Sequence, residues 1–183
     1  MVIKAENPEL LSIVSRILLN NGTAILPSDT LYGFSCIPGE AEKKIEMIKG
    51  RGEGKHFLKL ALKEQLPLLT DQLPDPKLLS YWPGPLTLIM KGKNNPTEGI
   101  RVPDNQFIQN ILRKVGLPII STSVNYSGQP PMTSIEEIIK EFESRVDLIV
   151  DAGVLPKSLP STIVDLTGSV PHLVRQGQLK VEL

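Results

Sequence analysis

The chain has 183 residues, of which 40% are hydrophobic, and this is enough to bury the core of one domain spanning residues 1–183. Twenty Lys and Arg residues balance twenty Asp and Glu residues, which excludes a strong overall attraction for nucleic acid or membranes and leaves anion binding to local clusters of cations. The single cysteine, Cys36, excludes an internal disulfide, and no stretch has the pattern of a signal peptide or a membrane-spanning helix, so we predict a cytoplasmic protein with no membrane partner.

The first part of the chain predicts two helices separated by a short strand. Asn7-Pro8 is typical of a helix start, and apolar residues recur at helical spacing from there to Asn20. Residues 23–26 predict a buried strand that runs into the polar segment 27–33, and the ends of strands are where α/β proteins usually bind ligands. A charged helix is expected over about residues 40–49, with Gly50 as its end.

A positive loop rich in glycine follows this second helix. Eleven residues contain three glycines and four cations, namely Lys49, Arg51, Lys55 and Lys59. Such a loop can fold around phosphate groups. It is not a Walker loop, because the glycine spacing and the Lys-Ser/Thr pair of that motif are missing.

The rest of the chain predicts further short strands and helices. We expect a capping role for Asp104 in a helix that ends at Gly116, and a capping box of Ser134 with Glu137 ahead of a helix over 135–142. The other expected elements are a helix over 76–81 and strands over 58–62, 86–90, 118–120, 148–150, 162–166 and 172–174. Because strands and helices alternate without a strict βαβ order, we predict an α/β fold of the α+β type, with a mixed sheet and helices on its faces.

The segment 118–128 is the strongest candidate for a ligand site. An apolar strand runs there into five hydroxyl-bearing residues and an amide, which offer more donors and acceptors than a turn consumes. A loop that satisfies only its own backbone is the alternative explanation.

Other types of site have weaker support. The two histidines, His56 and His172, lie far apart and neither accompanies a nucleophile motif, which argues against covalent hydrolysis. Three carboxylates near strand ends, Asp29, Asp151 and Asp165, leave general-base catalysis open. A small hydroxyl residue or an arginine recurs at the strand ends, which suits the binding of polyanions and carboxylates: Thr30, Arg51, Arg101, Ser123, Ser161 and Arg175.

Seven of these segments, in this order and spread over nearly the whole chain, resemble the motifs of the Sua5/YciO/YrdC family. They are 27–33 (PSDTLYG), 49–51 (KGR), 82–87 (WPGPLT), 101–103 (RVP), 121–128 (STSVNYSG), 161–165 (STIVD) and 175–177 (RQG). Seven ordered motifs are far more specific than any one of them.

The resemblance implies a three-layer domain in which a twisted mixed sheet, flanked by helices, surrounds a positively charged cavity. It also implies the activity of the family's best-known members, a nucleotidyltransferase reaction that makes threonylcarbamoyl-AMP and pyrophosphate from L-threonine, bicarbonate and ATP. The product serves the t6A modification of tRNA, so tRNA and the t6A transferase machinery are the implied partners. We expect Mg²⁺ to accompany ATP and to be held largely by the phosphates, because no acidic metal-binding motif is visible.

The resemblance also assigns roles to individual residues. Lys49 and Arg51 take the catalytic positions. The positions that contact ATP are Arg51, Lys55, Thr97, Ser123, Asn125 and Arg175, and those around threonine are Thr30, Arg101, Ser121 and Ser161. We expect Lys49, Arg51, Arg101, Ser123 and Arg175 to converge on one cavity.

Two other functions remain open. One is an RNA-binding or ribosome-maturation module of the YciO branch without adenylating activity, although the balanced charge and 4% aromatic content weigh against it. The other is a role in carbamoyl transfer in another pathway.

Overall fold

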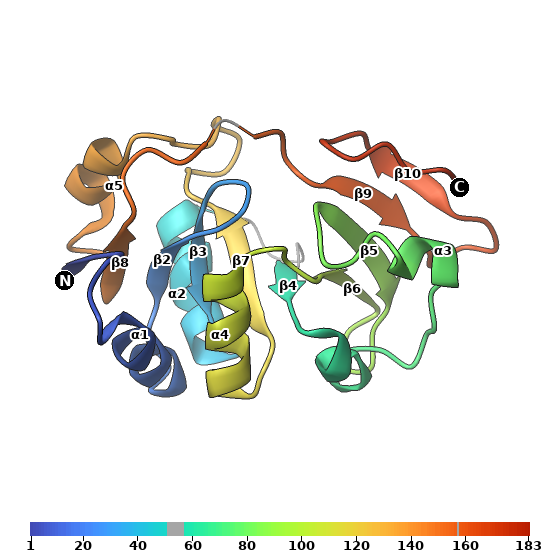
Figure 1. The fold of residues 1–183 in the computed structure, drawn as a ribbon, viewed down its shortest axis with the longest axis horizontal. Helices are drawn as coiled ribbons and strands as arrows, with labels where there is room; N and C mark the ends of the chain where they lie inside the picture. The colour runs from blue at the N-terminus through green and yellow to red at the C-terminus, as the bar shows by residue number, and fades with distance from the viewer. Residues whose placement is uncertain (51–56, 157) are drawn as a thin grey trace.

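The computed structural model of the chain describes residues 1–50, 57–156 and 158–183 (Figure 1). Within these residues the elements are β1 (Val2–Lys4), α1 (Leu10–Leu19), β2 (Ala24–Pro27), β3 (Tyr32–Cys36), α2 (Glu40–Lys49), β4 (Leu58–Leu60), a 3-10 helix (Lys63–Leu68), α3 (Pro76–Leu79), β5 (Leu86–Lys91), β6 (Thr97–Arg101), α4 (Gln106–Val115), β7 (Ile119–Ser123), α5 (Ile135–Phe142), β8 (Leu148–Asp151), β9 (Thr162–Asp165) and β10 (His172–Arg175). No helix of the described part is both long enough and apolar enough to cross a membrane.

The ten strands seen in these residues form one mixed sheet in the order β1-β8-β2-β3-β7-β4-β6-β5-β9-β10. Four of the pairs are parallel, namely β1 with β8, β8 with β2, β4 with β6 and β5 with β9, and the others are antiparallel. Strand β7 joins the two halves of the sheet, because it pairs with β3 on one side and with β4 on the other. The predicted mixed sheet flanked by helices is confirmed.

Helices cover both faces of the half of the sheet that contains β2, β3, β7 and β8 (Figure 1). Helices α1 and α4 pack against one face, over Leu26 and Ile119, and helices α2 and α5 pack against the other, over Ile25 and Ile120. Neighbouring residues of one strand are therefore buried on opposite faces, as the period of two residues requires. The chain has the three layers that we predicted.

The other half of the sheet has a smaller core of its own. Strands β5, β6 and β9 pack against the 3-10 helix, α3 and the buried ring of Trp82. The lone tryptophan, Trp82, is buried in this core, and its indole Nε1–H donates a 2.7 Å hydrogen bond to the carbonyl oxygen of Leu86. The free cysteine, Cys36, is buried in the core under α2 and α5.

Local details differ from the sequence predictions in a few places. Helix α4 is capped by Asn105 rather than Asp104, because the Asn105 Oδ1 accepts a 3.0 Å hydrogen bond from the Ile108 amide. The capping box at α5 is half formed: the Ser134 Oγ accepts from the Glu137 amide but donates to the carboxylate of Glu136.

Other differences concern the strands and helix lengths. Helix α1 begins at Leu10, strand β4 ends at Leu60 and helix α3 ends at Leu79, so these elements are shorter than predicted. Strands β1, β3 and β6 were not predicted from the sequence. By contrast, Gly50 ends α2 in the left-handed conformation, with φ of 59°, as expected.

We predict that Phe142→Ala will lower the free energy of unfolding by about 3–5 kcal/mol, because the ring is fully buried and its loss leaves a cavity. Phe142 attaches α5 to the sheet through an edge-to-face contact with Phe34, with ring centroids 5.0 Å apart. Urea denaturation measures the change. Leu73→Ala is the control, since Leu73 is 91% exposed and its loss should change stability by less than about 0.5 kcal/mol. A loss below about 1 kcal/mol for Phe142→Ala would contradict the packing described.

Candidate functional site

A cavity of about 270 Å³ lies where the two halves of the sheet meet. Its walls come from the loop between β2 and β3, from β4, β6 and β7, and from the start of β9 and the end of β10. Six of the residues that we predicted for the site line it: Thr30, Arg101, Ser121, Ser123, Ser161 and Arg175. These side chains come from five separate segments spread over nearly 150 residues, so the fold brings them together. Of the five residues that we expected to converge, Arg101, Ser123 and Arg175 line the cavity, Lys49 does not, and Arg51 lies outside the described residues.

Strand β7 presents its hydroxyl groups to this cavity. Ser121 and Ser123 are two residues apart and therefore lie on the same face of the strand. Gly33 lies opposite Ser123 on β3, and a Cβ atom at Gly33 would stand 2.8 Å from the Ser121 Oγ. Glycine at this position leaves room for the Ser121 hydroxyl at the cavity wall.

Arg101, at the end of β6, is the buried cation of the cavity, with 4% of its surface exposed. Its Nε donates to the carbonyl oxygen of Gly84 at 3.0 Å, its Nη1 donates to the Thr30 hydroxyl at 3.4 Å, and its Nη2 pairs with the Asp29 carboxylate at 2.5 Å. Burial lowers the pKa of Arg101, and the charge of Asp29 opposes this shift. The guanidinium remains a cation, because arginine is not deprotonated in proteins.

A second arginine, Arg175 at the end of β10, also lines the cavity. Its Nε and Nη2 donate to the carbonyl oxygen of Ser161 at 3.1 and 2.9 Å, and the Ser161 hydroxyl lies 2.8 Å from the hydroxyl of Thr87. The residue as a whole is exposed, but its guanidinium is partly covered, and this burial lowers the pKa of Arg175. The side chain can therefore contact an anion in the cavity while its backbone stays at the surface.

Lys49 and Asn125 support the wall from behind and do not line the cavity. Lys49 is buried, with 3% of its surface exposed. Its Nζ donates to the carbonyl oxygens of Ser123 and Asn125 and to the Asn125 Oδ1, at 2.6, 3.0 and 2.7 Å. The Ser123 hydroxyl also donates to the Asn125 Oδ1, at 2.8 Å. Lys49 thus fixes the turn that follows β7, and its charge lies beside Ser123.

The connection from β8 to β9 is hydrogen-bonded to the loop between β2 and β3 and to the first residue of β3. The Tyr32 hydroxyl donates to the carbonyl oxygen of Gly153 at 2.8 Å, and the Ser158 hydroxyl donates to that of Thr30 at 2.7 Å. Burial raises the pKa of Tyr32. These bonds position the segment that leads to Ser161.

The remaining predicted site residues lie elsewhere. Thr97 begins β6 and shares a strand face with Arg101, about 13 Å away, beyond the lining of this cavity. Arg51 and Lys55 lie outside the described residues. The charged residues of the described lining are two arginines and one aspartate. Because Arg51 and Lys55 are not among the described residues, a strongly positive cavity stays a prediction.

Sequence reasoning gave no binding role to Asp29 and Thr87. Asp29 was noted as a carboxylate near a strand end, but its partner Arg101 lies 72 residues away in the chain. Thr87 is a hydroxyl residue between the buried Leu86 and Leu88, and such a polar residue in an apolar strand was the available signal.

The described residues contain no group of three or more His, Cys, Asp or Glu side chains that could hold a metal ion. The one carboxylate among the described lining residues is Asp29. Mg²⁺ is commonly held by one or two carboxylates together with substrate phosphates, and this donor set is compatible with that mode but not with an ion held by protein alone.

Comparison with known proteins relates the chain to one family. A sequence profile of the Sua5/YciO/YrdC family, described as "Telomere recombination", matches residues 16–177. The threonylcarbamoyl-AMP synthase of Pyrococcus abyssi is 31% identical over 171 residues, which cover 85% of this chain and 50% of that protein.

Two solved structures share the fold. The crystal structure of P. abyssi Sua5 in complex with L-threonine superposes with a TM-score of 0.86 at 26% identity, over 97% of this chain and 57% of that one. Escherichia coli YciO superposes with a TM-score of 0.82 at 30% identity, over 97% and 94% of the two chains. This chain thus spans about half the length of the P. abyssi protein.

We predict that Lys49→Met will destabilise the protein by about 2–5 kcal/mol, because three acceptors in the turn after β7 lose their charged donor. Urea denaturation measures the change. Lys44→Met on the same helix is the matched control, since Lys44 forms an exposed ion pair with Asp147 at 3.0 Å and should contribute less than about 1 kcal/mol. Equal effects of the two substitutions would contradict the role given to Lys49.

Proposed function

The chain belongs to the Sua5/YciO/YrdC family, and from this premise we propose that it is a threonylcarbamoyl-AMP synthase. Its relative in P. abyssi carries that name. The observation that carries the proposal is the convergence of Thr30, Arg101, Ser121, Ser161 and Arg175 on one cavity. Hydroxyl groups suit an amino acid that bears a hydroxyl, and guanidinium groups suit carboxylates and phosphates.

The proposed reaction has two steps. The amine of L-threonine first combines with bicarbonate, losing water, to give a carbamate. An oxygen of the carbamate then attacks the α-phosphorus of ATP, and pyrophosphate leaves with the electron pair of the broken P–O bond. The chain would act as a transferase of the nucleotidyl group.

In this proposal, threonine binds at the inner end of the cavity. Arg101 and its neighbour Thr30 are linked by a hydrogen bond, and Ser161 lies within bonding distance of Thr87. Arg101 would hold the carboxylate of the substrate, while the hydroxyls of Thr30, Ser121 and Ser161 would surround its side chain. Holding the carbamate oxygen next to the α-phosphorus of ATP would lower the entropic barrier to the second step.

ATP would bind toward Ser123 and Arg175. The fork of Arg175 uses Nε and Nη2 for Ser161, and its remaining N–H groups could bind a phosphate oxygen. Arg51 and Lys55, which lie outside the described residues, and Thr97 complete the proposed set of contacts. Lys49 and Asn125 act in this scheme by fixing Ser123, and Lys49 adds a nearby positive charge.

Mg²⁺ is proposed to accompany ATP and to neutralise the charge of the leaving pyrophosphate. Among the described lining residues the one carboxylate is that of Asp29, and it is paired with Arg101, so the phosphates would hold most of the ion's coordination. The product would pass to the t6A transferase machinery that modifies tRNA.

We predict that pyrophosphate release will require ATP, L-threonine and bicarbonate together. Valine, which has the shape of threonine without the hydroxyl, should react with a kcat/KM roughly 5- to 150-fold lower, because the hydroxyl partners in the cavity lose a hydrogen bond worth about 1–3 kcal/mol. An enzyme-coupled pyrophosphate assay measures both. No release under any condition would favour the RNA-binding alternative, and equal use of valine would refute the assignment of the hydroxyl-lined wall to the substrate side chain.

We predict that Arg175→Lys will lower the rate of pyrophosphate release by roughly tenfold to a thousandfold, because lysine keeps the charge but cannot form two parallel hydrogen bonds. Arg145→Lys is the matched control. Arg145 contacts Glu141 at the surface and does not line the cavity, so its replacement should leave the rate unchanged. If both variants keep the parental rate, Arg175 does not contact the reacting phosphate.

A further inference from the structure

Asp29 has one carboxylate oxygen that lacks a partner. Its Oδ2 pairs with the Arg101 Nη2, whereas its Oδ1 is buried and accepts no hydrogen bond from any described residue. A buried acceptor without a donor costs free energy, and in native proteins such atoms usually have a partner. The missing donor can be supplied by a ligand, because Asp29 lines the cavity.

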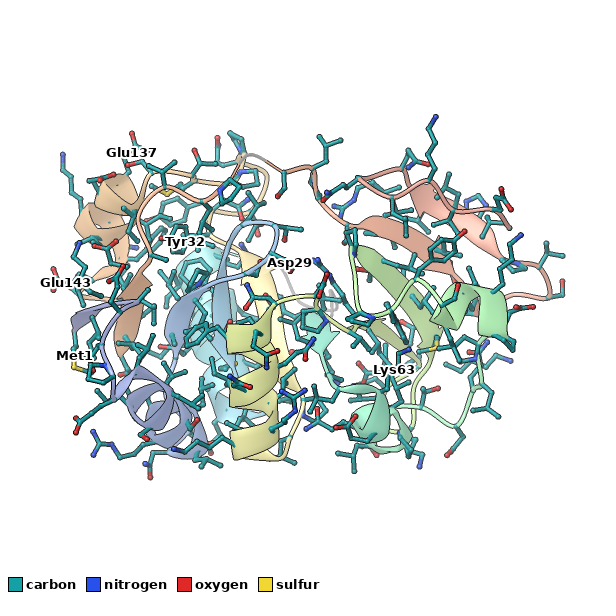
Figure 2. The ribbon with its side chains drawn as sticks, in the orientation of Figure 1. Met1, Asp29, Tyr32, Lys63, Glu137 and Glu143 are labelled. Atoms are coloured by element: carbon teal, nitrogen blue, oxygen red, sulfur yellow. The ribbon has the colours of Figure 1, made fainter. Side chains whose placement is uncertain are left out.

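The carboxylate can turn toward such a ligand. The side chain of Asp29 keeps 16% of its surface exposed, and Figure 2 shows Asp29 near the centre of the view, between the half of the sheet that ends in β7 and the half that begins with β4. The χ2 torsion of aspartate has a broad energy profile, so the carboxylate can rotate to bring its unpaired oxygen toward the cavity while the other oxygen stays near Arg101.

The guanidinium of Arg101, beside Asp29, also has N–H groups that donate no hydrogen bond to a described residue. Of its five N–H groups, three donate to Gly84, Thr30 and Asp29. Within the described part of the chain, the other two are left for a ligand. The site therefore offers N–H donors of a buried cation and, next to them, a carboxylate oxygen that needs a donor.

This pair has the charge pattern that complements a free α-amino acid, in which a carboxylate and an ammonium group are attached to the same carbon. We propose that Asp29 binds the α-amino group of the amino-acid substrate, while Arg101 binds its carboxylate. The inference rests on the proposed function and adds to it a residue that selects for the amine. An analogue of the same shape with hydrogen in place of the amino group would leave Asp29 without its donor and would bind less tightly.

The position of the amine also matters for the reaction. Its nitrogen is the atom that forms the bond to the bicarbonate carbon, so a carboxylate that holds the nitrogen determines where the carbamate forms. The role of Asp29 is the binding and orientation of this group.

The test compares two ligands that differ only in the amino group. L-Threonine and (R)-3-hydroxybutyrate share the carboxylate, the hydroxyl and the methyl group. We measure their dissociation constants by isothermal titration calorimetry with the full chain in bicarbonate-free buffer. The parent protein should bind threonine at least tenfold more tightly than 3-hydroxybutyrate, and equal affinities would overturn the proposal without any variant.

Asp29→Asn keeps the volume of the side chain but removes its charge. We expect it to weaken threonine binding by roughly 10- to 100-fold and 3-hydroxybutyrate binding by less than about threefold, so that the preference for the amine disappears. If Asp29 served only to orient Arg101, both ligands would weaken equally, and this result would overturn the proposal.

Two further variants complete the experiment. Asp71→Asn is the matched control, because Asp71 also pairs with a cation, Lys93 at 2.8 Å, but lies on the surface away from the cavity. It should leave both dissociation constants unchanged. Asp29→Glu keeps the charge and should retain a preference for threonine over 3-hydroxybutyrate; if this preference is lost, a carboxylate at this position is not what recognises the amine.

The outcome separates this inference from the proposed function. Binding that depends on the amine, without any release of pyrophosphate, would leave Asp29 as the amine ligand and remove the synthase assignment. Threonine-dependent release of pyrophosphate, together with an unchanged preference of Asp29→Asn for threonine over 3-hydroxybutyrate, would keep the synthase assignment and remove Asp29 as the amine ligand.

Discussion

The pairing of β7 with both β3 and β4 is the constraint on which the site depends. Ile119 and Ile120 pack into the cores on opposite faces of the sheet, which fixes both the position and the register of the strand. A shift by one residue would turn Ser121 and Ser123 away from the cavity. The apolar start of β7 therefore determines where its polar end lies.

The burial of Arg101 is the second constraint. Removing a cation from water is costly unless it is paired and hydrogen-bonded, and here a carboxylate, a carbonyl oxygen and a hydroxyl surround the guanidinium. The loop that supplies Asp29 and Thr30 comes from one half of the sheet, and Arg101 comes from the other. The ion pair thus crosses the junction of the two halves at the point where we place the substrate.

Much of the fold follows from local patterns in the sequence. Ala41 and Ile45 have helical spacing and pack one face of α2 into the core, and Gly50 ends that helix. Strands β3 and β6 were not predicted, because Tyr32–Cys36 is buried throughout and shows no alternation, while Thr97–Arg101 contains a single aliphatic residue. Their strand conformation comes from neighbours that lie far away in the chain.

The residues of the candidate site could be predicted where they belong to sequence motifs. Contacts between residues that lie far apart in the chain could not be predicted. The family resemblance named six of the residues that line the cavity, but neither the contact of Asp29 with Arg101 nor that of Ser161 with Thr87 has a local sequence signal. Likewise, a lysine in the last turn of a helix gives no sign that its amine binds the turn that follows β7, as that of Lys49 does.

The most direct test of this account is a crystal structure of the protein with L-threonine and a non-hydrolysable ATP analogue. We predict threonine in the cavity, with its carboxylate on Arg101 and its amine on Asp29. We predict the phosphates of the analogue beside Ser123 and Arg175. Threonine bound outside this cavity, or bound with its carboxylate away from Arg101, would contradict the account.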